Sequence, residues 1–520
     1  MVRTLTLTLF ACLASGPRQG PVSSNRGLLA FRQALLDAAS DARVLIVATH
    51  PDDPYRGMSL VLRRQYGMKV TVLVATRGEG GQNAVGPELG QELRRIRTAE
   101  TEAAARRLDV ELCFLELPDF GYCRTAAEAL DRWRGLRPRE RLERKLDELR
   151  PDLVLTPHLP GEPHGQKRAV FHLLSRVMKD RDVRFFHQVD PDVEIPSLDL
   201  DLDRPDPDIG ATYREMAYQA LLEHRTQGPH QSLEEEVRSP VCLRLASGGG
   251  HSPVSLYASL PSMWDDKDRL SQWLDEMHAG MDLERLRSEL GRLPGSYDLS
   301  KGAGKCMSLL GILRGLEQRA REGGDLETRL LQRIRALERA VLAASVHQSL
   351  LGPAEWEEGN EHLELRWRVR NRGSWPMRLV LDGLSPESAR FFRLVTPEGG
   401  SRADASARKS EGVTIRSRDL GELPIRLARS TLAGEPAAAM LELSAHLEIA
   451  ATRVPLRIRR RIRFIKPLEL KAEPESRFLV PAAGGELPFS LRFEKPRSRS
   501  IHGLLAMTGP QGFRFLPESD

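Results

Sequence analysis

Short aliphatic runs alternate with longer amphipathic stretches through the first part of the chain. Between about Val44 and Met178 the runs are VLIVAT, VTVLVAT, LCFLEL and DLVLTP, and apolar residues recur every three or four positions in the stretches between them. Continuous apolar runs are typical of strands buried on both faces, whereas the longer spacing is typical of amphipathic helices. The clearest helix is predicted at 89–108, where leucines and alanines share one face. The pattern therefore predicts an α/β fold, a parallel sheet joined by crossover helices.

The periodicity changes in the second half of the chain. Residues 261–345 follow the helical period, with a leucine stripe in LETRLLQRIRALERAVLAAS. Further on, HLELRWRVRNRG alternates apolar and charged residues and then turns, as half-buried antiparallel strands do. We therefore expect a helical segment at 261–345 and a β-sandwich-like domain at 346–467. A strand-rich stretch at 468–520 is expected to be an incomplete further domain.

The first residues have the order of a signal peptide, which we predict at 1–25. MVRTLTLTLFACLASG places one arginine before an apolar stretch and small residues after it. This order predicts an exported or envelope-associated protein. Threonines dilute the apolar stretch, so a disordered start on a cytoplasmic protein is the alternative. No later run is long enough to predict a transmembrane segment.

Charge and cysteine content narrow the function classes. The 520 residues carry a net charge of +5, with an isoelectric point of about 9.0, but acidic and basic residues are interspersed. Without a basic tract interleaved with aromatic residues, nucleic acid is not an expected partner. Four cysteines follow the leader without a CxxC pair and are expected to be buried singles, although export would permit a Cys113–Cys123 bridge. The sequence gives no oligomeric state.

The first aliphatic run ends in His50-Pro51-Asp52-Asp53. In a parallel sheet, ligands bind beyond the carboxyl ends of the strands, which is where these side chains are predicted. Imidazole and carboxylate groups are zinc ligands, and a further carboxylate can take the proton of a metal-bound water. Taken alone, the motif is also compatible with an aspartate pair that caps a helix.

The second run is followed by TRGEGGQN, residues 76–83. Its glycines permit close approach of the backbone to a ligand, and we expect Glu79 and Asn83 to lie around that ligand. The spacing is not G-x-G-x-x-G, so a dinucleotide site is disfavoured, and no G-x-S-x-G elbow is present in the sequence.

Several motifs in this order resemble the PIG-L/LmbE-like N-acetylglucosaminyl deacetylases, in the long bacterial branch with C-terminal β-domains. The resemblance covers roughly residues 40–260, within a domain that we place at 26–260, and implies a Rossmann-like sheet. The matching motifs are THPDD at 49–53, TRGEGGQN at 76–83, LRRIRTAETEAAARRL at 93–108, PDFGY at 118–122, HGQK at 164–167 and YREMAYQALLEHRTQG at 213–228.

The resemblance implies a zinc-dependent hydrolase that removes acetyl from an N-acetylated amino sugar, GlcNAc-like, or from a glycoconjugate. His50 and Asp53 match metal ligands, and Asp52 matches the general base that activates the metal-bound water. His164 matches the residue that helps to hold the developing oxyanion and the leaving amine.

Two further positions match residues that contact sugar hydroxyls in that family, Arg97 and Asp119. A carboxylate accepts hydrogen bonds from hydroxyl groups, which suits Asp119. Structural roles are the alternatives: Arg97 pairing with Glu100 or Glu102, and Asp119 capping a turn.

The sequence departs from the family where the third metal ligand is expected. Three residues after His164, the family has a histidine, whereas this chain has Lys167, and Pro54 replaces the usual glutamate. A lysine ligates metal only when deprotonated, which is costly because its ordinary pKa is about 10.4. As the alternative to a zinc-dependent deacetylase, we therefore hypothesise that the Lys167 ammonium takes the place of the metal, pairing with Asp52 and Asp53, in a metal-free, catalytically silent carbohydrate-binding homologue.

Another histidine could instead complete a metal site. His158 and His251 lie in predicted loops and are the more plausible substitutes. His172 lies eight residues beyond His164, about 12 Å along a helix, and would need a broken helix to reach the site. His224, in EHRTQG, is expected to be structural or to line the pocket.

Overall fold

The computed structural model describes residues 27–247, 260–320, 324–357, 360–395, 412–430, 438–449, 452–465, 469–473 and 490–494. The chain divides into two compact units, one comprising residues up to His347 with Asn371–Trp375 and the other comprising the remainder. The predicted signal peptide at 1–25 and His251 lie outside the described residues, and export stays a prediction.

The first unit is built on a seven-stranded sheet with the order β3-β2-β1-β4-β5-β7-β6. Neighbouring strands from β3 to β5 are parallel, while β7 pairs antiparallel with β5 and with β6. The strands are β1 (Arg43–Ala48), β2 (Lys69–Val74), β3 (Glu111–Phe114), β4 (Leu153–Thr156), β5 (Arg184–Gln188), β6 (Leu198–Leu200) and β7 (Val241–Ser247). The mostly parallel sheet confirms the predicted α/β fold.

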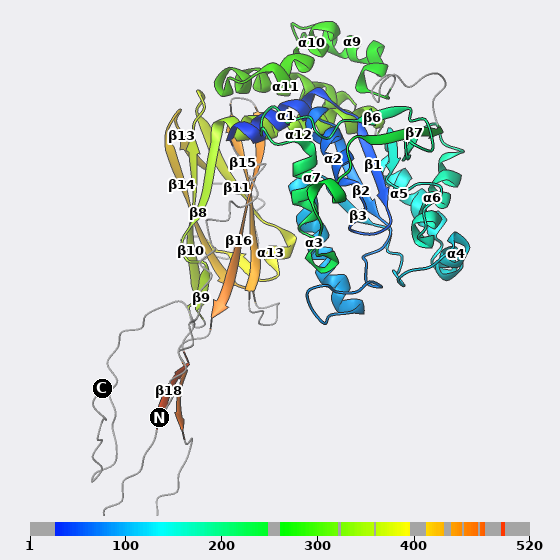
Figure 1. Ribbon diagram of the computed structural model, residues 1–520. Helices are drawn as coiled ribbons and strands as arrows, with labels where there is room; N and C mark the ends of the chain where they lie inside the picture. The colour runs from blue at the N-terminus through cyan, green and yellow to red at the C-terminus, as the bar shows by residue number, and fades with distance from the viewer. Residues whose placement is uncertain are drawn as a thin grey trace, which may run out of the picture. The chain divides into compact units, whose positions relative to one another are not determined.

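Helices cover both faces of this sheet (Figure 1). Every residue of β1 is buried, because its side chains point alternately into two apolar cores. One core lies under α2 and α7, and the other under α4, α5 and α6. The helices are α1 (Gly27–Ala39), α2 (Arg56–Leu60), α3 (Gly90–Leu108), α4 (Ala126–Trp133), α5 (Pro138–Leu149), α6 (Gly165–Met178), α7 (Tyr213–Leu221) and α8 (Leu233–Glu236). The helix predicted at 89–108 is α3.

Four further helices follow in the same unit: α9 (Lys267–Glu276), α10 (Leu283–Arg292), α11 (Leu299–Arg319) and α12 (Asp325–Ser345). Arg329 and Arg333 of α12 are 1% exposed each. Arg329 donates to both carboxylate oxygens of Asp152, at 2.6 and 3.2 Å, and Arg333 lies 3.2 Å from a carboxylate oxygen of Asp41. These ion pairs attach α12 to the segments that enter β1 and β4.

Short helical turns complete the first unit. They are the π-helical turn η1 (Val61–Gln65) and the 3-10 turns η2 (Arg134–Leu136), η3 (Arg225–Gln227), η4 (Met263–Asp266) and η5 (Leu293–Gly295). The turn η1 contributes Val61 and Leu62 to one of the two cores of the sheet. No helix among the described residues is both long and apolar enough to cross a membrane.

The second unit contains two antiparallel-rich sheets, ordered β12-β14-β10-β8 and β13-β11-β15-β16-β9. Trp356 of the larger sheet stacks on Phe392 of the smaller one, with ring centroids 6.2 Å apart, so aromatic side chains join the two sheets. The strands are β8 (Val346–Leu351), β9 (Glu355–Glu357), β10 (His362–Asn371), β11 (Met377–Leu384), β12 (Phe392–Leu394), β13 (Gly412–Ile415), β14 (Leu420–Arg429), β15 (Ala438–Ile449) and β16 (Thr452–Ile465), with the short helix α13 (Pro386–Ala389). Two further strands, β17 (Glu469–Glu473) and β18 (Ser490–Glu494), pair antiparallel. The predicted β architecture of this part is confirmed.

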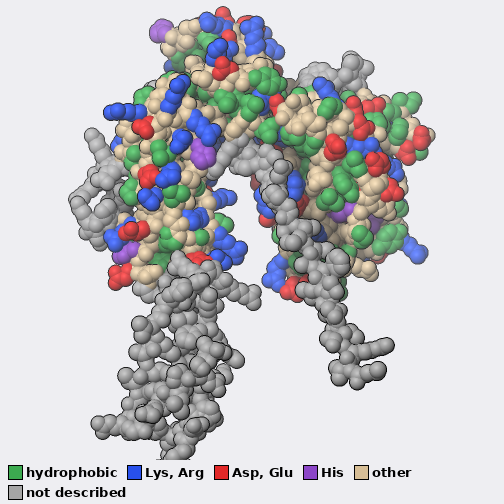
Figure 2. Space-filling model, turned by 60° about the vertical axis from the view of Figure 1, so that its left-hand side comes forward, with side chains coloured by type: hydrophobic (Ala, Val, Ile, Leu, Met, Phe, Trp, Pro, Cys, Tyr) green, Lys and Arg blue, Asp and Glu red, His purple; other side chains and the backbone are tan. Residues whose placement is uncertain are grey.

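Charged side chains of both signs are interspersed with apolar ones on the face shown in Figure 2. The four described cysteines, Cys113, Cys123, Cys242 and Cys306, are all free. The bridge considered between Cys113 and Cys123 is therefore not formed in this structure.

Candidate active site

Most of the predicted site residues come from loops at the carboxyl ends of four adjacent strands, while Lys167 lies at the start of α6 and Arg97 on α3. His50, Asp52 and Asp53 follow β1, Glu79 and Asn83 follow β2, Asp119 follows β3, and His158, His164 and Lys167 follow β4. The strand order places these loops side by side, as expected for parallel strands.

Asp53 is the most enclosed carboxylate of the cluster, with 1% of its surface exposed. Its Oδ2 accepts hydrogen bonds from the backbone N–H of Thr49, at 2.7 Å, and of His50, at 2.8 Å. Its Oδ1 lies 2.8 Å from the Nζ of Lys167, near the start of α6. The loop after β1 thus folds around this carboxylate, and Lys167 supplies the neutralising charge.

Electrostatics keep both partners ionised. Burial raises the pKa of Asp53, but the charge of Lys167, followed by those of His158 and His50, lowers it more, to well below its ordinary value. The charge of Asp53 is the main cause that raises the pKa of Lys167 above its ordinary value, against the effect of burial. Lys167 is therefore an ammonium at neutral pH, without a lone pair for a metal.

The residues present do not fit the zinc site that the resemblance implies. Of the three positions, His50 and Asp53 carry ligand groups, but the third is a protonated Lys167 whose ammonium occupies Oδ1 of Asp53. Among the described residues, no three His, Cys, Asp or Glu side chains are grouped to hold a metal ion. The third ligand is thus replaced by a cation.

Of the histidines considered as substitutes, those that the structure describes, His158, His172 and His224, are not grouped with two further ligands. His158 is fully buried, its Nε2 lies 2.8 Å from the hydroxyl of Thr49 and 3.4 Å from Oδ2 of Asp53, and burial lowers its pKa to about 4. His172 is exposed on α6. His224 is fully buried behind the site, where burial first and then the charge of Arg56 hold its pKa well below the ordinary value.

Asp52 is not part of the ion pair. Its carboxylate is exposed, and no described residue gives it a hydrogen bond or a salt bridge. The hypothesis that Lys167 pairs with both aspartates is therefore correct for Asp53 and wrong for Asp52, which only helps to raise the pKa of Lys167 through its charge. A free carboxylate at this position can accept hydrogen bonds from a ligand.

Three rings in edge contact form one wall of the site. The His50 and His164 centroids are 5.0 Å apart at an interplanar angle of 70°, and those of His164 and Tyr122 are 5.2 Å apart at 85°. Burial, followed by the charges of His50 and Lys167, lowers the pKa of His164, so its imidazole is neutral at pH 7. Tyr122 is 66% exposed and forms the outer end of this wall.

Gln166, which lies in the HGQK motif but for which no role in the site was predicted, fixes the turn after β3. It is fully buried, and its side-chain amide donates to Oδ1 of Asp119, at 3.0 Å, and to the carbonyl of Gly121, at 2.6 Å. The backbone N–H of Gly121 also donates to Oδ1 of Asp119, at 2.9 Å. Asp119 therefore caps the turn through one oxygen, and the described residues give its other oxygen no partner.

Arg97 braces the loop after β2. Its guanidinium is buried and donates to the carbonyls of Gly78 and Gln82 and to the hydroxyl of Thr226. Glu100, considered as its partner, instead accepts from Thr226, at 2.6 Å. A role of Arg97 on sugar hydroxyls stays a prediction, since the hydrogen bonds described here go to the protein.

The other two residues predicted in this loop also hold the loop itself. Oε1 of Glu79 accepts from Arg94, at 3.0 Å, and the side-chain amide of Asn83 donates to Glu88, at 2.7 Å. These contacts position the backbone around Gly80, and their part in ligand binding stays a prediction.

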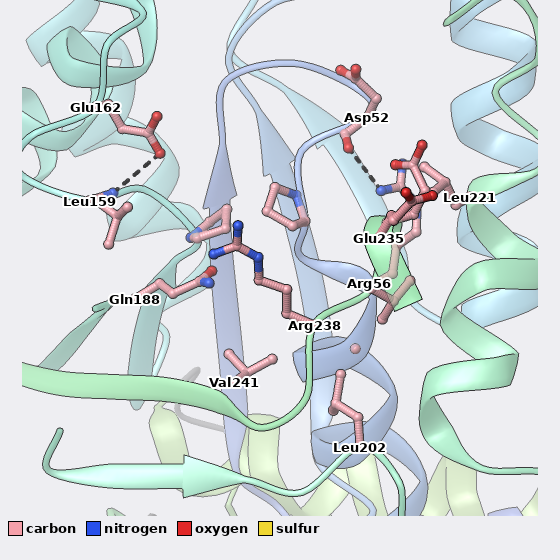
Figure 3. A pocket seen from close by; sticks show the side chains of 15 residues that line it. Asp52, Arg56, Leu159, Glu162, Gln188, Leu202, Leu221, Glu235, Arg238 and Val241 are labelled. Atoms are coloured by element: carbon pink, nitrogen blue, oxygen red, sulfur yellow. Dashed lines mark hydrogen bonds between the residues drawn. The ribbon is translucent and has the colours of Figure 1, made fainter. Parts of the chain in front are cut away.

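A cavity of about 290 Å³ opens beside Asp52 (Figure 3). Its walls include residues at the ends of β4, β5 and β7, namely Pro157, Gln188 and Val241. No motif pointed to it, because its walls come from segments far apart in the sequence: Asp52, Pro54, Arg56, Gly57, Pro157, Leu159, Glu162, Gln188, Leu202, Leu221, Glu235, Glu236, Val237, Arg238 and Val241.

Comparisons with solved structures give several similar folds at low identity. N,N'-diacetylchitobiose deacetylase from Pyrococcus horikoshii is 21% identical, with 42% of this chain and 88% of that chain covered and a TM-score of 0.31. The A40926 pseudoaglycone deacetylase Dbv21 is 17% identical over 40% of this chain and 100% of that chain, with a TM-score of 0.29. The 4-carboxy-2-hydroxymuconate hydratase GalB from Pseudomonas putida is 16% identical over 41% and 100%, with a TM-score of 0.30.

No curated protein matches the chain in sequence. The model of one family matches residues 45–178, from β1 to the end of α6, and that family is PIG-L, described as GlcNAc-PI de-N-acetylase. This range contains each of the predicted site residues. Residues 45–178 of this chain are a PIG-L domain, which confirms the resemblance drawn from the motifs.

Proposed function

We propose that the first unit of this protein binds an N-acetylated amino sugar, GlcNAc-like and free or in a glycoconjugate, without a metal ion and without hydrolysing it. The sugar class follows from the deacetylase family to which the domain at residues 45–178 belongs. Export, which would place this binding outside the cytoplasm, is part of the proposal and rests on the leader sequence alone.

The observation that carries the proposal is the contact of 2.8 Å between Lys167 and Asp53. A divalent cation could bind Oδ1 of Asp53 only if the Lys167 ammonium moved away. Asp53 would then lose its contact with a cation that belongs to the chain and gain a contact with an ion from solution. The Lys167 ammonium carries one positive charge, whereas a zinc ion carries two. The ammonium therefore cannot lower the pKa of a water molecule as a bound zinc ion does.

The remaining groups suit sugar binding. The Asp52 carboxylate and the second oxygen of Asp119 accept hydrogen bonds from hydroxyl or amide N–H groups. The neutral His164 supplies a ring nitrogen for a further hydrogen bond. The exposed ring of Tyr122 offers an apolar surface to the C–H face of a pyranose.

A zinc-dependent deacetylase is the second candidate. The free carboxylate of Asp52 favours it, because this residue is unpaired and accessible, as a general base requires. This candidate requires that the Lys167 side chain, which is 26% exposed, rotate out of the site and that another group complete the ligand set.

The deciding experiment measures zinc content, sugar affinity and acetate release on the same full-length preparations. The unmodified protein and Lys167→His are incubated with zinc and dialysed, and zinc is then quantified. Calorimetry measures binding of N-acetylglucosamine, and an acetate assay measures hydrolysis. Arg95→His is the matched control, because Arg95 is a 78% exposed cation on α3 outside the site.

We expect the unmodified protein and Arg95→His to bind the sugar, to retain no zinc and to release no acetate. Lys167→His should retain about one zinc per chain. One zinc per unmodified chain together with acetate release would overturn the metal-free proposal and establish the second candidate. Absence of both zinc and sugar binding would overturn sugar binding itself.

A further inference from the structure

The cavity beside Asp52 has an apolar floor. Leu202, Leu221, Val237 and Val241 form it and belong to the core, with at most 9% of each residue exposed. Leu202 packs directly against Gly57, where a Cβ would lie 2.3 Å from its Cδ1. The floor is thus a fixed surface, able to take the C–H groups of a ligand.

Polar groups with unused hydrogen-bonding capacity stand above this floor. The guanidinium of Arg238 points into the pocket (Figure 3), and the described residues give it no hydrogen-bond or salt-bridge partner. Oε1 of Gln188 is enclosed and accepts no hydrogen bond in the described part of the chain. Glu162 accepts a long hydrogen bond, of 3.5 Å, from the backbone of Leu159, and its Oε1 lies 4.0 Å from the Nδ1 of His158. These groups offer both donors and acceptors to a ligand.

The charges of the walls limit what the cavity can hold. Four carboxylates face two arginines, and one of these, Arg56, already donates to the carbonyls of Pro51, Asp52 and Asp53. An anionic ligand would therefore meet an excess of negative charge. An alkyl chain in the cavity would shield Glu162, Gln188 and Arg238 from water and offer them no hydrogen bonds. Each of these groups would then lower the binding free energy that the ligand gains.

A neutral polyhydroxyl ring carries no charge and can form hydrogen bonds with the polar groups of the walls. Its hydroxyl groups donate to Gln188 and Glu162 and accept from Arg238, while its C–H face lies on the apolar floor. The volume, about 290 Å³, is close to the lower limit of ligand pockets and suits a single ring rather than a longer chain.

We propose that this cavity is a second saccharide subsite, which binds the sugar unit attached to the N-acetylated one. Asp52 belongs to the walls of the cavity and to the cluster around Asp53, so a ligand that contacts it can extend in both directions. This inference rests on the proposed function. It makes the physiological ligand a glycan of at least two units, with Arg238 and Gln188 as the groups that recognise the second.

The test compares three neutral probes by calorimetry on the full chain: N-acetylglucosamine, N,N'-diacetylchitobiose and N-hexanoylglucosamine. We expect the disaccharide to bind about tenfold more tightly than the monosaccharide and the hexanoyl sugar to show no gain. In Arg238→Ala and Gln188→Ala, the ratio of disaccharide to monosaccharide affinity should fall roughly three- to tenfold, as expected for one lost hydrogen bond. Arg95→Ala, on the exposed face of α3, is the control.

Each other outcome has a definite meaning. Equal affinities for the monosaccharide and the disaccharide would overturn the second subsite and leave the proposed function intact. A disaccharide gain that persists in both variants would place the second unit elsewhere and overturn the assignment of this cavity. A gain for the hexanoyl sugar that the variants alter would make the cavity an acyl pocket. If no probe binds, the proposed function fails and the subsite fails with it.

Discussion

Lys167 and Asp53 form an ion pair of 2.8 Å in which the carboxylate is fully enclosed and the lysine side chain is 26% exposed. Its two residues stand at positions to which the resemblance drawn from the motifs assigns two metal ligands. Whereas a metal must be captured from solution, this cation is part of the chain, and its charge is present as soon as the domain folds.

The pair predicts strong energetic coupling between the two positions. Asp53→Asn leaves an ammonium without its counter-charge, and we expect it to lower the free energy of unfolding by about 2 kcal/mol, less than for a fully buried pair because Lys167 is partly solvated. Lys167→Met should cost a similar amount. The double variant should cost clearly less than the sum, because neither charge is then left alone. Urea denaturation of the four proteins measures this, and simple additivity would contradict the pairing.

The contact between the loops after β2 and β3 predicts a sensitive glycine. A Cβ on Gly80 would lie 2.3 Å from the backbone nitrogen of Gly121 and 2.8 Å from the carbonyl oxygen of Asp119. Gly80→Ala must push these loops apart, so we expect a loss of about 1–3 kcal/mol in stability and at least a fivefold loss in affinity for N-acetylglucosamine.

Gly161 provides the control for this substitution. It lies in the loop after β4, and nothing would lie within 4 Å of an added Cβ. Gly161→Ala should leave stability and affinity unchanged within error. Equal behaviour of the two variants would show that the loops do not depend on each other.

The buried His224 predicts a dependence of stability on pH. Its pKa in the folded protein lies well below the ordinary value of 6.5, chiefly because of burial. As the pH falls below 6.5, the unfolded chain takes up a proton that the folded chain does not, so this residue makes the unfolding free energy decrease by up to about 1.4 kcal/mol per pH unit.

Denaturation at several pH values between 7 and 5 measures this slope. His224→Gln should reduce it by about one proton. His278→Gln, which replaces an exposed histidine, is the control variant. An unchanged slope in His224→Gln would mean that the imidazole is protonated in the folded protein.

The helix α12 predicts a stability effect far from the site. Arg329 is buried against Asp152 and also donates to the carbonyl of Asp41, at 3.1 Å. Arg329→Met leaves Asp152 with Arg43 as its remaining arginine partner, and we expect a loss of about 3 kcal/mol. Arg335→Met, an exposed position on the same helix, should change stability by less than about 0.5 kcal/mol, and thermal or urea unfolding distinguishes the two.

Much of the sheet could be predicted because its strands are buried on both faces. β1, β2 and β4 appear in the sequence as short apolar runs, a pattern that is typical of strands buried on both faces. The clustering of His50, Asp53, Asp119 and His164 also follows from this sheet, since parallel strands bring their carboxyl ends to one edge.

The roles of Arg97 and Gln166 could not be predicted, for a physical reason. Arg97 donates to two backbone carbonyls and Gln166 to one, and because every residue has a carbonyl, the sequence does not identify these acceptors. The cavity beside Asp52 could not be predicted from the sequence for a related reason. Its walls run from position 52 to position 241, and only the fold brings Gln188 and Arg238 to the same space.

The arginines of α12 also determine where the first unit can be cut. A fragment that ends with the family match at residue 178, or at 260 after the last strand of the sheet, loses Arg329 and Arg333 and leaves Asp41 and Asp152 enclosed without those cations. The shortest piece suited to expression and crystallisation should therefore extend through Ser345, well beyond the end of the family match at residue 178.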